Sequence, residues 1–169
     1  QKLFNQGMIL SYSYRDERGK YYHPSEVEMR DGRSWVAGTE TELETQVEKM
    51  SKSKKNTVDP LDIVDEFGAD TLRMYEMFMG PLEQVKPWQT NGCKGVRSFL
   101  SRVYRMFVDE EGQPRHHGPA DRELTKALHV AIKEATDGIE ALKFNTPVSK
   151  MMEFINTSKG RCPERSVGE

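Results

Sequence analysis

The first third of the chain alternates short runs of tyrosine, valine and tryptophan with turn residues, a pattern typical of short strands. Asp31–Gly32 lies between two such runs and favours a tight hairpin, because both central residues of this turn adopt positive φ. We therefore expect a small β-meander from about residue 9 to residue 38. The acidic stretch 39–48 fits a linker or a final strand, and residues 1–8 fit the end of a helix closed by Gly7.

Beyond residue 58 the spacing of apolar side chains becomes helical. Asp59 suits an N-cap, Pro60 suits the first helical position and Gly68 suits the end of that helix. A second helix is expected at 70–79, and three longer amphipathic helices follow at about 96–107, 124–142 and 146–155. The pattern predicts a mainly α chain with a small β part, in which the β-meander and a lysine-rich loop precede an antiparallel helical bundle.

Composition narrows the class of protein. The 169 residues are 36% hydrophobic and 31% charged, and 25 basic side chains nearly balance 27 acidic ones, for a formal charge of −2. Any nucleic-acid contact must therefore come from local basic clusters. Cys93 and Cys162 form no C-x-x-C pair and no apolar run approaches ~18 residues, so we expect a reducing, cytoplasmic setting and no membrane span. His116 and His117 have no third ligand at a suitable spacing, so no metal site is expected.

Four lysines fall within seven residues, between the predicted strands and the first capped helix: Lys49, Lys52, Lys54 and Lys55. A cluster of this kind most often forms a solvated basic loop. Its first five residues form the string Lys49-Met50-Ser51-Lys52-Ser53, and a specified pentapeptide arises by chance only roughly once in a few million positions. This string resembles the second signature of class I aminoacyl-tRNA synthetases.

The resemblance implies that the loop acts on ATP, with Mg²⁺ as the counter-ion of ATP, bound mainly outside this segment. Amino-acid activation is attack of a carboxylate on the α-phosphate, and negative charge accumulates on the departing β- and γ-phosphates. Two ammonium groups on a mobile loop can stabilise that charge. Lys49 and Lys52 would then be the catalytic, phosphate-facing residues. Ser51 and Ser53 would donate hydrogen bonds, and Met50 would complete the ATP-binding loop by packing.

Segments on both sides of the loop resemble the leucyl enzymes of this class in particular. They are Leu3–Leu10 before the loop and Met77–Trp88 after it, and Gly95–Val103 and Phe144–Thr146 also match. Phe67–Arg73 resembles the wider subgroup of leucyl, isoleucyl, valyl and methionyl enzymes, which activate large aliphatic residues. The likeness covers about residues 1–157 and implies a chain of four parts. These are a remnant of the catalytic domain at 1–58, connecting helices at 59–88, an incomplete tRNA-binding helical bundle at 89–157 and an irregular tail at 158–169.

The resemblance as a whole implies part of a leucine–tRNA ligase, which activates leucine with ATP and transfers it to tRNA(Leu). The chain departs from the family in having no H-x-G-H signature, because His23, His116, His117 and His129 are never spaced in that way. We expect the isolated chain to be inactive, since its partners would include the catalytic and editing domains that it lacks. The alternative function is a non-catalytic tRNA-binding or protein-interaction module derived from a synthetase by truncation.

Two further expectations concern charged side chains. Arg97, Arg102 and Arg105 lie largely off the apolar stripe of their helix. Exposure to solvent is the simpler interpretation, and contact with tRNA phosphates is the one that the resemblance favours. Residues 48–56 contain one apolar side chain, that of Met50, so we expect this loop to be mobile and only loosely held. We name its residues 49–56 the lysine loop.

Overall fold

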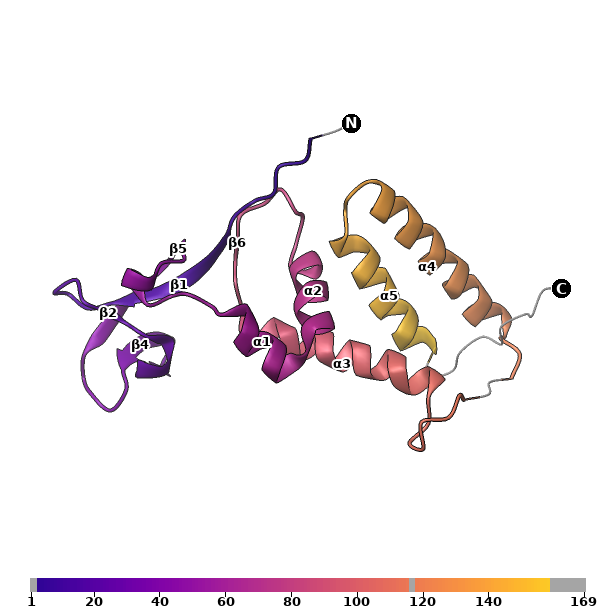
Figure 1. Ribbon diagram of the computed structural model, residues 1–169, viewed down its shortest axis with the longest axis horizontal. Coiled ribbons are helices and arrows are strands. Elements are labelled where there is room, and N and C mark those ends of the chain that lie inside the picture. Colours follow the sequence, from indigo (N-terminus) through magenta and orange to yellow (C-terminus); the bar gives the residue numbers. More distant parts are fainter. Residues whose placement is uncertain (1–2, 116–117, 159–169) are drawn as a thin grey trace. The chain divides into compact units, whose positions relative to one another are not determined.

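The structure is a computed structural model that describes residues 3–115 and 118–158 (Figure 1). The chain divides into two compact units, one of Gln1–Glu66 with Glu83–Thr90 and the other of Phe67–Leu82 with Asn91–Glu169. The segment 59–88 is therefore shared between the two units. The predicted tail at 158–169 lies outside the described residues apart from Ser158, which is the last residue of a helix.

The first unit is built on a sheet of six strands among the described residues. The strands are β1 (Ile9–Arg15), β2 (Tyr21–Tyr22), β3 (Val27–Arg30), β4 (Arg33–Val36), β5 (Glu42–Lys49) and β6 (Lys86–Pro87). Along the sheet the order is β2-β1-β5-β4-β3, with antiparallel neighbours throughout, and the short β6 pairs with β1 in parallel. The end of β5 therefore lies beside the start of β1.

This strand order corrects the expected β-meander. A meander pairs each strand with the next along the chain, whereas β2 and β3 are not neighbours and β5 lies between β1 and β4. The acidic stretch is a strand rather than a linker, and β5 is long enough to pair with β1 from Leu10↔Lys49 to Arg15↔Glu44. The hairpin at Asp31–Gly32 is confirmed, with φ of 48° and 79° at its two central residues.

The segment before β1 is not the end of a helix, which corrects the second expectation for this region. Residues 3–8 have no regular secondary structure. Gly7 serves a close approach instead, because a Cβ at this position would lie 2.2 Å from the carbonyl oxygen of Gln84. The Lys86 N–H donates to the carbonyl oxygen of Met8 at 3.1 Å, so a side chain at Gly7 would push β6 away from β1.

Five α-helices are formed by the described residues: α1 (Pro60–Phe67), α2 (Ala69–Phe78), α3 (Thr90–Phe107), α4 (Arg122–Glu140) and α5 (Asn145–Ser158). Two short 3-10 helices, η1 (Pro24–Glu26) and η2 (Lys52–Lys54), lie in the first unit. The Asp59 carboxylate accepts a hydrogen bond from the Leu61 N–H at 2.9 Å, so the predicted cap of α1 is confirmed. Within the described residues, every helix is too short or too polar to cross a lipid bilayer.

The second unit is helical. Helices α4 and α5 lie side by side and antiparallel, and α2 also contacts α5 (Figure 1). Phe99 and Met106 of α3 form the core cluster with Ile155 of α5, and partly buried methionines pack around them. The described chain is thus a mixed fold of helices and an antiparallel sheet, with the larger share of its residues in helices.

The buried faces of α3 and α4 are narrower than the predicted apolar stripes. On α3, Met106 is buried, whereas Tyr104 and Phe107 are 62% and 49% exposed. On α4, Ile132 and Ile139 are 52% and 53% exposed. Each stripe is wider than the helix surface that packs against a neighbour, so the residues at its edge face solvent.

Two helical glycines provide a matched test of the packing of α4 on α5. A Cβ at Gly138 would lie 2.3 Å from Cγ of Pro147, whereas nothing lies within 4 Å of a Cβ at Gly95. Gly95→Ala should raise the free energy of unfolding by about 1 kcal/mol, because alanine is the better helix former. Gly138→Ala should lower it by about 1–3 kcal/mol, because the rigid proline ring forces the helices apart. Urea unfolding followed by circular dichroism measures both, and a stabilised Gly138→Ala variant would contradict this packing.

Candidate functional site

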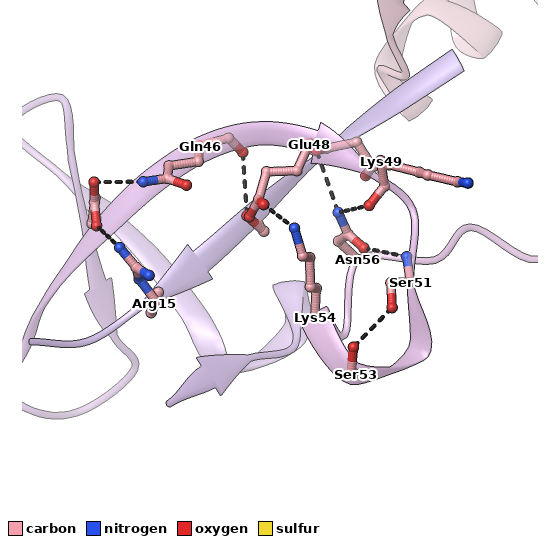
Figure 2. A network of polar contacts seen from close by, with 11 residues as sticks. Arg15, Gln46, Glu48, Lys49, Ser51, Ser53, Lys54 and Asn56 are labelled. Atoms are coloured by element: carbon pink, nitrogen blue, oxygen red, sulfur yellow. Dashed lines mark hydrogen bonds and ion pairs between the residues drawn. The ribbon is translucent and has the colours of Figure 1, made fainter. Parts of the chain in front are cut away.

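The lysine loop leaves the sheet at the end of β5 (Figure 2). Lys49 is the last residue of β5 and pairs with Leu10 of β1, and η2 then spans Lys52–Lys54. Lys55 adopts a left-handed conformation, with φ of 53° and ψ of 26°, which turns the chain sharply after η2. Asn56 follows this turn, and its side chain lies at the base of the loop.

Asn56 joins the two ends of the loop to the sheet. Only 1% of this residue is exposed, and its Oδ1 accepts a hydrogen bond from the Ser51 N–H at 2.8 Å. Its Nδ2 donates to the carbonyl oxygens of Ser11 and Lys49, each at 3.5 Å. An amide side chain suits this place because it supplies an acceptor and two donors at once.

A carboxylate on β5 holds one lysine of the loop. Glu48 forms an ion pair with Lys54 and also accepts a hydrogen bond from the Ser13 hydroxyl on β1 (Figure 2). The hydrogen bond from Lys54 lowers the pKa of Glu48 below its usual value, with a smaller effect from Ser13. The same bond raises the pKa of Lys54. The side chains of Lys54 and Glu48 are 30% and 19% exposed, so water screens part of their attraction.

A second carboxylate holds the last lysine of the loop. Lys55 Nζ lies 3.2 Å from Oε2 of Glu26, which is the last residue of η1. The pKa of Glu26 is lowered chiefly by the hydrogen bond from the His23 N–H and next by the one from Lys55. Two of the four loop lysines are therefore paired with carboxylates of the chain itself.

Lys49 and Lys52 differ from the other two lysines. Both are exposed, and no ion pair among the residues that the structure describes includes either of them. The hydroxyls of Ser51 and Ser53 lie 2.8 Å apart, and Met50 is half-buried. The loop therefore presents two positive charges without counter-charges, together with two hydroxyls, an arrangement that can receive the oxygens of a polyanion.

The three arginines singled out on α3 have different surroundings. Arg102 donates to Oδ1 of Asn156 at 2.7 Å and so ties α3 to α5. Arg97 and Arg105 are exposed, and within the described ranges neither belongs to an ion pair. The three look alike in the sequence because Asn156 is 54 residues away from Arg102, and only the fold brings the two together.

The described residues hold no group of three or more histidine, cysteine, aspartate or glutamate side chains that could bind a metal ion. His116 and His117 lie outside the described residues. What the lysine loop offers a ligand is ammonium groups and hydroxyls, which suit phosphate oxygens.

Two residues that shape the loop were absent from the predicted site. Glu48 carries a usable signal, because it alternates with Glu44 and Gln46 along one polar face of a strand. Asn56 carries no such signal, because its buried contact is with the carbonyl oxygen of Ser11, which is 45 residues away in the chain.

Comparisons with known proteins decide the family. A family model described as class I tRNA synthetases (I, L, M and V) matches residues 39–86, which contain the lysine loop. Leucine–tRNA ligase 1 of Rhizobium johnstonii is 51% identical over 172 residues, covering 99% of this chain and 20% of the ligase. The chain belongs to the leucyl-tRNA synthetase family. The resemblance inferred from the lysine loop and its flanking segments is thereby confirmed.

A solved structure of a leucyl-tRNA synthetase also resembles this chain. It is the ternary complex of Agrobacterium radiobacter K84 LeuRS with tRNA and LeuAMS, with a TM-score of 0.55 and 29% identity. The match covers 66% of this chain and 16% of that one. The chain spans about a fifth of the length of the curated relative that it matches.

Exchanging single lysines of the loop tests the two ion pairs separately. Lys54→Gln should raise the pKa of Glu48 and spare that of Glu26, whereas Lys55→Gln should do the reverse. Because its pKa is lowered, Glu48 adds stability that is present above the usual glutamate pKa and is lost as the pH falls through the lowered value. NMR titration of the side-chain carboxyl carbons measures both pKa values. Equal shifts in the pKa values of Glu48 and Glu26 in either variant would contradict the pairing of Glu48 with Lys54 and of Glu26 with Lys55.

Proposed function

We propose that this chain supplies the ATP-phosphate-binding loop and the tRNA-docking helices of a leucine–tRNA ligase. The observation that carries the proposal is the division of the loop lysines. Lys54 and Lys55 are held by carboxylates of the chain, whereas Lys49 and Lys52 are exposed and available to a ligand. Membership of the leucyl-tRNA synthetase family supports ATP, leucine and tRNA(Leu) as the substrates.

The proposed chemistry is activation of leucine. The leucine carboxylate attacks the α-phosphate of ATP, the bond to the β-phosphate breaks, and pyrophosphate leaves with the bonding electrons. Lys49 and Lys52 stabilise the negative charge that grows on the departing phosphates. Lysine suits this task because it is a compact charge on a flexible stem. The hydroxyls of Ser51 and Ser53 donate to phosphate oxygens, and Mg²⁺ accompanies ATP as its counter-ion.

The helical unit is proposed to contact the phosphates of tRNA(Leu). Arg97 and Arg105 are exposed and lie about two turns apart on one side of α3, a spacing that suits two phosphates of one strand. Arg102 is engaged by Asn156 and is therefore assigned a structural role. The tRNA in the ternary complex of the Agrobacterium radiobacter enzyme supports tRNA as a partner at the level of the family.

The second candidate function is a non-catalytic tRNA-binding or protein-interaction module. The observation that favours it is that Arg97 and Arg105 are exposed on α3, in a compact unit other than the one that holds the lysine loop. In either case we propose that the chain by itself forms no leucyl-adenylate.

Leucine-dependent ATP–pyrophosphate exchange separates the two functions. It is measured on the chain and on a chimera, in which the chain replaces the aligned stretch of the Rhizobium johnstonii ligase. An active chimera supports the ligase function. A folded chimera that binds tRNA without exchange activity supports the module, and exchange by the chain alone would contradict its proposed inactivity.

In the chimera, Lys52→Ala should lower kcat for pyrophosphate exchange by roughly two to three orders of magnitude, comparable to the loss of one preorganised oxyanion donor. KM for ATP should change much less, because the charge that Lys52 meets develops late in the reaction. Lys20→Ala is the matched control, because Lys20 is an exposed lysine outside the loop, and it should retain the activity. A raised KM with an unchanged kcat would make Lys52 a plain binding residue.

Arginine variants of the chimera test the proposed tRNA contact. Arg97→Gln and Arg105→Gln should each weaken tRNA(Leu) binding and reduce the slope of log K against log salt by about 1, because each loses one phosphate contact. Arg102→Gln should keep the salt slope and lower the free energy of unfolding, because it loses the bond to Asn156. Filter binding over a series of salt concentrations measures the slopes. An equal loss of slope in all three variants would contradict the division among them.

A further inference from the structure

We propose that Asn56 is a positioning residue, which holds the lysine loop in the conformation that exposes Lys49 and Lys52 together. This proposal rests on the function proposed above for the loop and deepens it. With 1% of its surface exposed, Asn56 acts through the backbone of the loop and not on a ligand.

The contacts of Asn56 fall on the two residues that flank Met50. Its Oδ1 accepts from the Ser51 N–H at 2.8 Å, and its Nδ2 donates to the Lys49 carbonyl oxygen at 3.5 Å (Figure 2). A third contact, to the carbonyl oxygen of Ser11, fixes the same amide to β1. Loss of the Asn56 side chain would therefore release the backbone directly after Lys49 and directly before Lys52.

Lys55, the residue before Asn56, has a backbone conformation that must be stabilised by surrounding contacts. Lys55 has φ of 53°, a region that side-chain-bearing residues seldom occupy. Such a conformation persists where surrounding contacts hold it. Here the hydrogen bonds of Asn56 on one side and the Glu26 ion pair on the other supply those contacts.

Asparagine fits this place better than either aspartate, which has nearly the same shape, or alanine, which has no polar side chain. Aspartate has no donor for the carbonyl oxygens of Ser11 and Lys49, and it would bring a negative charge to a buried site that faces both. Alanine would leave the Ser51 N–H and both carbonyl oxygens without their partner. Either change should loosen the base of the loop while the β-sheet keeps its own hydrogen bonds.

The Glu48–Lys54 ion pair has a different effect. It holds the side chain of a lysine that points from η2 toward β5, and it contacts neither the backbone of Lys49 nor that of Ser51 (Figure 2). Lys54→Gln therefore serves as a control for general loosening of the loop. Asn5→Asp is the matched control for the chemical change, because Asn5 is an exposed asparagine of the same unit.

Hydrogen exchange on the 169-residue chain tests the anchoring role of Asn56 by itself. In Asn56→Ala the Ser51 N–H should exchange roughly tenfold faster or more, while the amides shared by β1 and β5 keep their protection. Asn5→Asp should change neither the exchange rate of the Ser51 N–H nor the protection of the amides shared by β1 and β5. Unchanged exchange at Ser51 in Asn56→Ala would overturn the proposal. If Asn56→Ala lost protection across the whole sheet, the exchange rate of the Ser51 N–H would be measured in Asn56→Asp instead. Faster exchange there would support the proposal, and unchanged exchange would overturn it.

Pyrophosphate exchange by the chimera tests the consequence for catalysis. Asn56→Ala and Asn56→Asp should lower kcat roughly ten- to a hundredfold, as expected for misplaced catalytic groups, with little change in KM for ATP. Lys54→Gln and Asn5→Asp should lower it far less. A normal kcat in both Asn56 variants beside an impaired Lys52→Ala variant overturns the positioning role alone. A fully active Lys52→Ala variant overturns the proposed function, and the positioning role falls with it.

Discussion

The pairing of β1 with β5 is the constraint on which the candidate site depends. It runs over six residue pairs and brings the end of β5, where the lysine loop begins, beside Ser11 and Ser13 of β1. These two serines are 8% and 2% exposed, and their small side chains leave room for the side chains of Asn56 and Glu48. A larger residue at either serine would occupy the space in which the loop is anchored. The sequence of β1 therefore shapes a loop that lies more than thirty residues further along the chain.

Two of the four positive charges of the lysine loop are neutralised within the described part of the chain and two are not. Four ammonium groups close together repel one another, and the chain relieves this repulsion by pairing two of them with its own carboxylates. The pairs involve Lys54, the last residue of η2, and Lys55, which follows it, and they leave Lys49 and Lys52 uncompensated. A ligand that carries several negative charges would then find its complement in the two uncompensated lysines, which lie within the residues 39–86 that match the class I tRNA synthetase family model.

Local features of this fold were predictable from the sequence, and features that join distant residues were not. The cap at Asp59 and the hairpin at Asp31–Gly32 depend on neighbouring residues and were found. The strand order, the burial of Asn56 and the bond between Arg102 and Asn156 depend on pairs far apart in the chain. Hydrophobic periodicity gives no information about such pairs.

The lysine pentapeptide was visible in the sequence as a string, but its anchoring was not. We expected a loosely held loop because Met50 is its only apolar side chain. The structure adds hydrogen bonds and ion pairs made by polar residues, Asn56, Glu48 and Glu26. Polar anchoring of this kind escapes an argument built on apolar side chains, because it depends on which donors and acceptors the fold brings within reach.

Acetylation footprinting of the four loop lysines tests whether Lys49 and Lys52 are the two that meet the ligand. The chimera with the Rhizobium johnstonii ligase would be treated with an acetylating reagent with and without ATP and leucine, and each lysine would be quantified by mass spectrometry. We expect ATP and leucine to protect Lys49 and Lys52 and to leave the reactivity of Lys54 and Lys55 nearly unchanged. Protection of Lys54 and Lys55 in place of Lys49 and Lys52 would contradict it.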